Sequence, residues 1–319
     1  SSNILAESTK SFPMQVSKYL ERIKYADDEK ISEKSIATLY KLHRAHVLAI
    51  PFENLDIHRN KNISLLDTDD SNALERIYHK LVTQNRGGFC FEHNRLFYWI
   101  LQEVGFTDSW FVAARVFEPV MGIWSRYYSH CAIIYEDDSE KLWFCDVGFG
   151  SSCLEPLKLV LDEVQTQSDS HQLKFELHEE EVDNQIVSLY YLLYFDKITQ
   201  KWTNRIKFQI NPAEFSSFDP ACQFVQGPEA IFSKKIVVSL RTPTLRKTLA
   251  GLKYVTTIID SSKDNENGTP ARTEKELTEQ EFYHILKEEF GIVLDDEGKY
   301  FLEFERTKAA PSPVWTNLQ

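Results

Sequence analysis

The segment Arg86-Gly87-Gly88-Phe89-Cys90 places a cysteine where a nucleophilic thiolate would be stabilised. The two glycines permit a tight turn with positive φ in front of a helix that begins at Cys90. The N–H groups and positive dipole end at a helix N-terminus favour an anion, and the thiolate is the reactive form of cysteine. Cys90 is therefore a candidate nucleophile. The open alternative is a small residue packed in the core.

A thiolate nucleophile needs a base and a group that orients the base, and one predicted hairpin carries both. Its strands span 129–136 and 141–147. If the hairpin is symmetric about Asp138, His130 lies directly opposite Asp146, with the two Cβ atoms about 5 Å apart. A slip of one residue would put the two side chains on opposite faces. Taken singly, a core histidine and a turn carboxylate are the alternatives, but their joint placement favours a Cys-His-Asp triad.

The remaining histidines and cysteines do not form a metal-binding pattern. Cys90 and His93 form a Cys-x-x-His pair, and Cys131, Cys145 and Cys153 follow, but a second tight ligand pair is missing. We therefore predict that the chain holds no metal. Glycine-rich phosphate-binding motifs are also missing, so a nucleotide-containing ligand would bind by other means.

The composition limits the partners and the compartment. The 319 residues include 36 Lys and Arg against 48 Asp and Glu, a net charge of −12. This charge argues against nucleic acid or an anionic membrane as the main partner. The sequence contains no apolar run of the ~18 residues that span a bilayer. Five cysteines are an odd number and widely spaced, which argues against a disulfide framework and predicts a cytoplasmic protein.

The first hundred residues have helical periodicity. A helix is expected over 36–49, ending before Pro51. A second apolar stripe covers 74–82, with Asn72 and Glu75 as a capping box in front of it. A third helix is expected from Cys90 to Val104, ended by Gly105.

The later residues have strand-like patterns. Short segments rich in β-branched and aromatic residues predict an antiparallel sheet or barrel at 109–117, 129–136, 141–147, 172–177, 186–195 and 201–210. The polar run 166–171 is expected to be a surface loop. A third region contains predicted strands near 235–241, 252–259 and 271–277, a loop at 261–270, and a helix with a capping box at Thr278 and Glu281 that ends at Gly291. The tail from 309 is expected to be irregular.

These patterns predict an α+β chain in three parts. Residues 1–106 form a helical bundle with the nucleophile, 107–210 form an antiparallel β-barrel with the histidine and aspartate, and 211–319 form a smaller α/β unit with the tail.

Several segments together resemble the arylamine N-acetyltransferases. They are Arg86–Asn94 (RGGFCFEHN), Ile50–His58 (IPFENLDIH), His130, and Asp146–Gly150 (DVGFG). The resemblance extends in order and spacing over about residues 15–300. It implies a helical bundle, a β-barrel and an α/β lid, in a cysteine-protease-like arrangement. The length of the chain and its C-terminal tail point towards a eukaryotic, fungal branch.

The resemblance also implies an activity. Cys90, His130 and Asp146 would form a catalytic triad that moves an acyl group from acyl-CoA, with acetyl-CoA as the default donor, in a ping-pong reaction. The acceptors would be arylamines, arylhydrazines or N-hydroxyarylamines, as in xenobiotic metabolism. Glu53 is expected to pair with Arg86 and so to position the glycine turn.

Further site residues follow from matching positions in the family. Ser129, Phe149, Ser151 and Cys153 are expected to contact the acceptor, and simple core packing is the alternative for Phe149. Arg126, Tyr127, Gln223 and Glu229 are expected on the CoA side, although the chain departs from better-known members there. Cys131, Cys145 and Cys222 are assigned to packing. Because CoA is an anion, a local basic cleft is expected despite the net charge of −12.

Alternatives to acetyl transfer remain open. Arg126 near the thioester could pair with the extra carboxylate that malonyl-CoA carries, which makes malonyl transfer a hypothesis; a solvated loop arginine is the other interpretation. A Cys-His-Asp triad also serves thiol hydrolases and transglutaminase-like enzymes, and the fold could belong to an inert binding protein.

Overall fold

The structure is a computed structural model of the whole chain. It describes residues 13–26, 31, 34–59, 63–65, 72–119, 121–150, 153–182, 184–197, 199–259, 271–294 and 302. The predicted loop at 261–270, the tail from 309 and the predicted site residue Ser151 lie outside the described residues.

The first part of the chain is helical. Its helices are α1 (Val16–Arg22), α2 (Ile36–Ala49), α3 (Leu55–His58), α4 (Ala73–Tyr78) and α5 (Cys90–Glu103). A π-helical turn, η1 (His79–Thr83), continues α4. The short strand β1 (Phe52–Glu53) separates α2 from α3. The expected helices over 36–49 and from Cys90 are confirmed, with Gly105 at positive φ behind α5.

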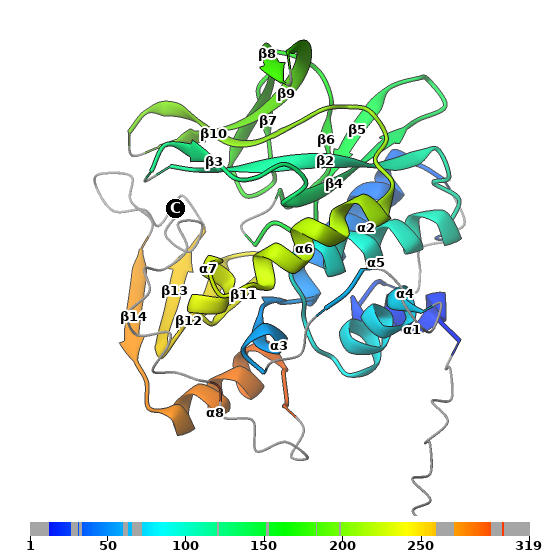
Figure 1. Cartoon of the computed structure of the whole chain (residues 1–319). Helices are drawn as coiled ribbons and strands as arrows, with labels where there is room; N and C mark the ends of the chain where they lie inside the picture. The colour runs from blue at the N-terminus through cyan, green and yellow to red at the C-terminus, as the bar shows by residue number, and fades with distance from the viewer. Residues whose placement is uncertain are drawn as a thin grey trace, which may run out of the picture.

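A nearly closed antiparallel barrel follows. Its strands are β2 (Ser109–Glu118), β3 (Ile123–Trp124), β4 (His130–Glu136), β5 (Leu142–Cys145), β6 (Leu157–Lys158), β7 (Gln165–Thr166), β8 (Gln172–Val182), β9 (Gln185–Asp196) and β10 (Lys201–Phe208). They pair in the order β6-β5-β4-β2-β10-β9-β8-β7, with β3 on β2. The barrel lies across the top of the molecule, above the helices and the second sheet (Figure 1).

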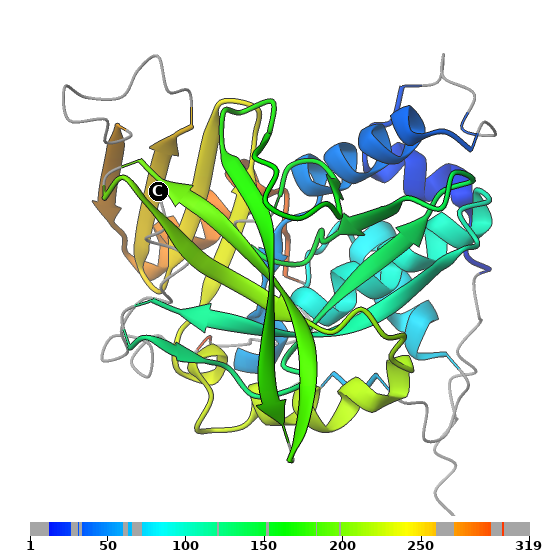
Figure 2. The same ribbon diagram turned by 90° about the horizontal axis from the view of Figure 1, so that it is seen from above.

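The last part is a second sheet with helices. It begins with the 3₁₀ turn η2 (Phe215–Phe218) and the helices α6 (Asp219–Gln226) and α7 (Ile231–Lys234). The strands β11 (Val237–Arg241), β12 (Leu245–Ala250), β13 (Lys253–Ile258) and β14 (Arg272–Glu276) then precede α8 (Glu279–Phe290). The sheet order is β1-β11-β12-β13-β14, so β1 ties the first part of the chain to the last. From above, this sheet and the N-terminal helices lie on opposite sides of the barrel (Figure 2).

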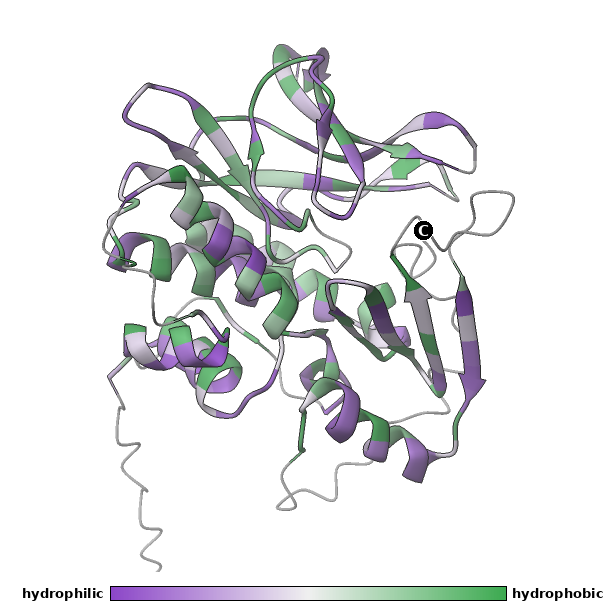
Figure 3. Cartoon of the chain, turned by 180° about the vertical axis from the view of Figure 1, so that it is seen from behind, coloured by the Kyte–Doolittle hydropathy of each residue, from purple (hydrophilic) through white to green (hydrophobic). Residues whose placement is uncertain are grey.

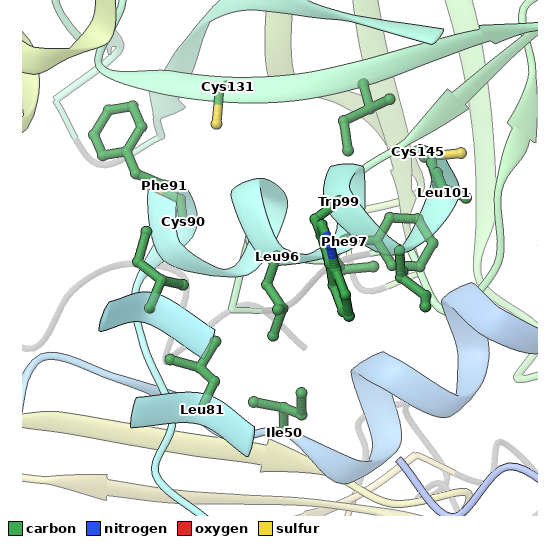
Figure 4. Packing of buried hydrophobic residues seen from close by; sticks show 14 of the residues in the cluster. Ile50, Leu81, Cys90, Phe91, Leu96, Phe97, Trp99, Leu101, Cys131 and Cys145 are labelled. Atoms are coloured by element: carbon green, nitrogen blue, oxygen red, sulfur yellow. The ribbon is translucent and has the colours of Figure 1, made fainter. Parts of the chain in front are cut away.

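Three hydrophobic clusters hold these layers. One joins α2, α4 and α5 to the near face of β2 and β4, a second fills the barrel, and a third packs α8 onto β11 and β12. Figure 4 shows the first cluster, with Leu96 and Trp99 of α5 pointing down and Cys131 of β4 above the helix. The outer strand β14 is exposed at all five residues and hydrophilic throughout (Figure 3).

Some sequence-based expectations about elements were wrong. Asn72 makes no capping hydrogen bond through its side chain, so the first capping box is absent, whereas the Thr278–Glu281 box is present. Strand β12 was not predicted. The expected loop at 166–171 is found as a tight turn over 167–171 between β7 and β8, in which the Gln167 side chain is buried. Among the described residues, no helix is long and apolar enough to cross a membrane.

Candidate active site

The turn before Cys90 is built against strand β1. Glu53 N–H donates to the Gly88 carbonyl at 2.8 Å, and Gly88 N–H donates to the Pro51 carbonyl at 3.3 Å. A Cβ on Gly87 would lie 2.0 Å from the Pro51 oxygen. The expectation of positive φ was wrong, because neither Gly87 nor Gly88 has it. Glycine is required at position 87 because two backbones approach each other there.

The predicted pair of Glu53 and Arg86 is confirmed. Arg86 Nε and Nη2 donate to Glu53 Oε1 at 2.9 and 2.6 Å, and Nη2 also reaches Asp56 Oδ1 at 2.9 Å. Glu53 Oε2 accepts from the Leu55 N–H at 2.7 Å, so the carboxylate bridges the turn and α3.

The ion pair extends into a buried network that sequence reasoning missed. Lys80 Nζ donates to both Glu92 oxygens at 2.9 and 3.0 Å and lies 3.1 Å from Asp56 Oδ2. Glu92 Oε2 accepts from the Phe89 N–H at 3.1 Å and so caps α5 one residue before Cys90. Burial raises the pKa of Glu92 to about 7, against the opposing effect of Lys80. The network therefore holds the N-terminal end of α5, where the candidate nucleophile Cys90 lies.

The candidate base and its partner are in contact. His130 Nε2 donates to Asp146 Oδ2 at 2.7 Å, and both side chains are buried. The expected register was wrong: Glu136 pairs with Leu142 and Ile133 with Cys145, so the hairpin is centred on Ser139. The shift of two residues keeps each side chain on its face, which is why the predicted contact forms.

The environment of this pair favours charge separation. Burial alone would lower the pKa of His130, but the Asp146 carboxylate and a hydrogen bond to the Cys90 side chain raise it to about 10. Burial opposes ionisation of Asp146, yet His130, Asn94 and the Gly148 N–H hold the pKa of its carboxyl below the ordinary value. The imidazole therefore carries a proton at neutral pH and lies between the thiol and the carboxylate.

Two residues without a predicted role hold Asp146 in place. Asn94 Nδ2 donates to the Cys131 carbonyl at 2.7 Å and to Asp146 Oδ1 at 3.0 Å, and Asn94 Oδ1 accepts from the Val147 N–H at 3.1 Å. His43 Nε2 accepts from the Asp146 N–H at 3.2 Å. Asn94 follows Cys90 by one helical turn, so the sequence alone could have indicated that the amide lies on the same face of the helix as the cysteine.

Gly148 lets the loop that follows Asp146 pack closely against Cys90. A Cβ there would lie 2.6 Å from the Cys90 carbonyl oxygen and 2.7 Å from Asn94 Nδ2. The DVGFG segment can therefore pack directly on the first turn of α5.

A chain of neutral rings supports the same turn. His93 Nε2 donates to the Pro51 carbonyl at 3.0 Å, His46 Nε2 donates to His93 Nδ1 at 2.9 Å, and the Tyr19 hydroxyl donates to His46 Nδ1 at 2.8 Å. Burial lowers the pKa of His93 to about 4, so the ring is neutral, as these donor and acceptor roles require.

Comparison with known proteins agrees with this geometry. A sequence model of the N-acetyltransferase family matches residues 35–299. Arylamine N-acetyltransferase 2 of Mus musculus is 30% identical over 88% of this chain and 95% of its own length, and arylamine N-acetyltransferase 1 of Homo sapiens is 28% identical with the same coverage. The chain belongs to the arylamine N-acetyltransferase family. It is therefore an acyltransferase by family.

Solved structures support the fold. The arylamine N-acetyltransferase of Mycobacterium abscessus is similar with a TM-score of 0.74 at 27% identity, covering 92% of this chain and 95% of that one. The Mycobacterium marinum enzyme, solved in complex with CoA, has a TM-score of 0.72 at 22% identity, covering 93% and 99%, and shows the shared fold.

In this N-acetyltransferase, Phe149 is in contact with the histidine, and Ser129 and Cys153 lie nearby in sequence or in the same hydrophobic cluster. Phe149 packs edge-on against His130 with ring centroids 5.6 Å apart, and it lies in the barrel cluster with Cys153. Burial raises the pKa of the Cys153 thiol to about 12, so this second thiol stays neutral. Ser129 directly precedes the histidine, and its hydroxyl pairs with that of Ser125 at 2.6 Å.

The residues expected on the CoA side come from the loop before β4, from α6 and from the short connection between α6 and α7. The Arg126 guanidinium lies 3.8 Å from the ring centroid of Phe224, which places the loop before β4 beside α6. Gln223 donates to the Ile63 carbonyl at 3.1 Å, and Glu229 pairs with Lys234 at 3.4 Å. Tyr127 lies under the Arg115 guanidinium at 4.5 Å. Within the described residues, no group of three or more metal-ligating side chains is found.

Proposed function

We propose that this chain transfers an acetyl group from acetyl-CoA to the nitrogen of an arylamine, arylhydrazine or N-hydroxyarylamine through a thioester on Cys90. The observation that carries the proposal is the buried His130 imidazole, hydrogen-bonded to the Asp146 carboxylate and to the Cys90 side chain at the start of α5.

In the first half-reaction, the Cys90 sulfur attacks the thioester carbonyl of acetyl-CoA. The C–S bond to CoA breaks, and the leaving thiolate takes the proton held by His130. The Cys90 N–H, at the positive end of α5, is the donor that we assign to the developing oxyanion. Because one thioester replaces another, the acyl-enzyme is close in energy to the reactants.

In the second half-reaction, the amine nitrogen attacks the carbonyl of the acyl-enzyme. His130 takes a proton from the nitrogen as the tetrahedral intermediate collapses, and the sulfur of Cys90 leaves as the thiolate. Asp146 stays ionised and stabilises the imidazolium. The products are the amide and an enzyme ready for another acetyl-CoA.

We assign the acceptor to the side of His130 where Phe149 and Cys153 lie, with Ser129 and Ser151 as further contacts. The donor is assigned to the side where Arg126 stacks on α6, with Tyr127, Gln223 and Glu229 as further contacts.

We also propose the division into 1–106, 107–210 and 211–319, because separate hydrophobic clusters fill the inside of the barrel and the face of the second sheet, and most of the third cluster comes from the helices. A cytoplasmic location is proposed because all five cysteines are free thiols.

Intact-mass spectrometry after mixing with acetyl-CoA, with no amine present, tests this function. A stable adduct of one acetyl group on the wild type, lost in Cys90→Ser and discharged by added arylamine, supports it. Immediate hydrolysis of acetyl-CoA without an adduct would indicate a thiol hydrolase, and no reaction would indicate a binding protein.

A further inference from the structure

The ring of His43, on α2, is hydrogen-bonded through both of its nitrogens. Nδ1 donates to the Leu154 carbonyl at 3.1 Å, and Nε2 accepts from the Asp146 N–H at 3.2 Å. The residue is fully buried, and burial lowers the pKa of the ring to about 4. The ring is therefore neutral near pH 7, with its proton on Nδ1, as these two contacts require.

The two partners of this ring are the two ends of one connection. Asp146 directly follows β5, and Leu154 lies shortly before β6. Phe149 and Cys153, which we assign to the acceptor side, lie between them in sequence. Within the described part of this connection, no backbone hydrogen bond joins one end to the other. The imidazole of His43 is thus a direct bridge between the two ends.

The bridge rests on rigid parts of the fold. The His43 ring packs edge-on against Phe97 of α5, with ring centroids 5.6 Å apart. This is the helix that begins at the candidate nucleophile Cys90. His43 therefore fixes the connection relative to the helix that carries the nucleophile.

Neighbouring contacts hold the second end of the connection in place. Arg44, the next residue of α2, pairs with Glu155 at 2.9 Å. The Glu155 N–H donates to the buried Gln167 side chain at 2.8 Å. The segment that follows Cys153 is therefore held from α2 and from the turn between β7 and β8.

Such a bridge affects both substrates. The position of the Asp146 backbone decides where its carboxylate meets His130, and a misplacement of about 1 Å in a catalytic group can cost about 100-fold in rate. The position of the Leu154 backbone decides where the preceding Cys153 lies. Asn94 differs from His43 because it holds only the first end, through the Asp146 carboxylate and the Val147 N–H.

Resting on the proposed function, we propose that His43 is a positioning residue that couples the triad to the acceptor side. Its ring holds the aspartate of the triad and the segment next to Cys153 in one fixed arrangement. The ring does this through the backbone at both ends of the connection, on the opposite side of Asp146 from its hydrogen bond to His130.

Steady-state kinetics with two readouts test this coupling. In a ping-pong reaction, kcat/KM for acetyl-CoA reports on the first half-reaction alone. The second readout is kcat/KM for 4-butylaniline divided by that for 4-methylaniline. An effect on the triad cancels in this ratio, whereas an effect on the acceptor side does not.

The test compares two variants of His43 with two control variants. His43→Leu removes both hydrogen bonds, and His43→Gln keeps one donor and one acceptor. Asn94→Ala disturbs Asp146 without removing a contact to Leu154. Leu39→Ala, on α2 and buried as completely as His43, shows the effect of a packing defect alone.

We expect His43→Leu to lower kcat/KM for acetyl-CoA about 10-fold and to change the amine ratio by about 3- to 10-fold. His43→Gln should show the same changes at smaller size, and it carries the comparison if His43→Leu is isolated unfolded. Asn94→Ala should lower the acetyl-CoA value but keep the amine ratio, and Leu39→Ala should keep both.

Three results would overturn the coupling. They are an unchanged acetyl-CoA value in both His43 variants, an amine ratio that changes no more than in Asn94→Ala, and the same changes in Leu39→Ala. A wild type that acetylates neither amine would instead overturn the proposed function.

Discussion

Replacement of Asn94 by alanine is expected to weaken both the fold and the triad. The buried amide makes three hydrogen bonds, to the Cys131 carbonyl, to Asp146 Oδ1 and from the Val147 N–H. Each is worth about 1 kcal/mol net, and a buried partner left unsatisfied costs about 1–3 kcal/mol. Asn94→Ala should therefore lower the free energy of unfolding by about 3–5 kcal/mol.

The expected kinetic effect is smaller than the loss of Asp146 itself. After the substitution, Asp146 Oδ1 still accepts from the Gly148 N–H at 3.0 Å, and Oδ2 still accepts from His130. The carboxylate loses one of its restraints, so we expect the rate of acyl-enzyme formation to fall by about 10-fold.

Urea unfolding and the burst of CoA release measure the two effects. Gln102→Ala is the matched control, because this amide lies on the same helix and also makes two hydrogen bonds, away from the triad. The control should be destabilised less and should keep the wild-type burst rate. If Asn94→Ala shows the stability of the control, or an unchanged burst rate, Asn94 does not position the aspartate.

Three further predictions follow from the same contacts. Gly148→Ala places a Cβ 2.6 Å from the Cys90 carbonyl oxygen, so it should cost about 1–3 kcal/mol of stability and lower the acylation rate about 10- to 100-fold in the burst assay; an unchanged rate would contradict the close approach. Lys80→Met leaves Glu92 and Asp56 without their shared cation, so the free energy of unfolding measured in urea should fall by about 3–5 kcal/mol. An unchanged free energy of unfolding would show that the network does not stabilise the fold. Because the pKa of His130 is raised from 6.5 to about 10, its contribution to stability is full below pH 6.5 and lost as the pH rises to 10. Between pH 6.5 and 10, the urea midpoint of the wild type should therefore fall more than that of His130→Gln. If the two midpoints fall in parallel with pH, the raised pKa of His130 is refuted.

The contacts between the candidate site residues could be predicted from the sequence, but the backbone geometry that makes these contacts could not. His130 and Asp146 were paired correctly from a register that was two residues out, because strand side chains alternate with a period of two. The glycines before Cys90 were assigned to a positive φ, whereas Gly87 serves a close approach to Pro51, a residue that is distant in sequence. Local patterns do not reveal such long-range contacts.

Buried polar residues were the other source of error. Strand β12 was missed because its buried face carries Arg246 and Thr248, which reverses the usual apolar pattern. The network around Lys80 and Glu92 was missed for the same reason, since charged residues on a helix are normally expected to face solvent. The Lys80–Glu92 network lies next to the candidate site, because Glu92 caps the helix that begins at Cys90.

The proposed function requires Cys90 to carry the acyl group between donor and acceptor. The most direct measurement is intact mass with peptide mapping after acetyl-CoA is mixed with the wild type in the absence of amine. We expect one acetyl group, located on Cys90, that disappears on addition of an arylamine while the amide forms in equal amount. An acetyl group on another residue, or amide formation by Cys90→Ser at the wild-type rate, would contradict it.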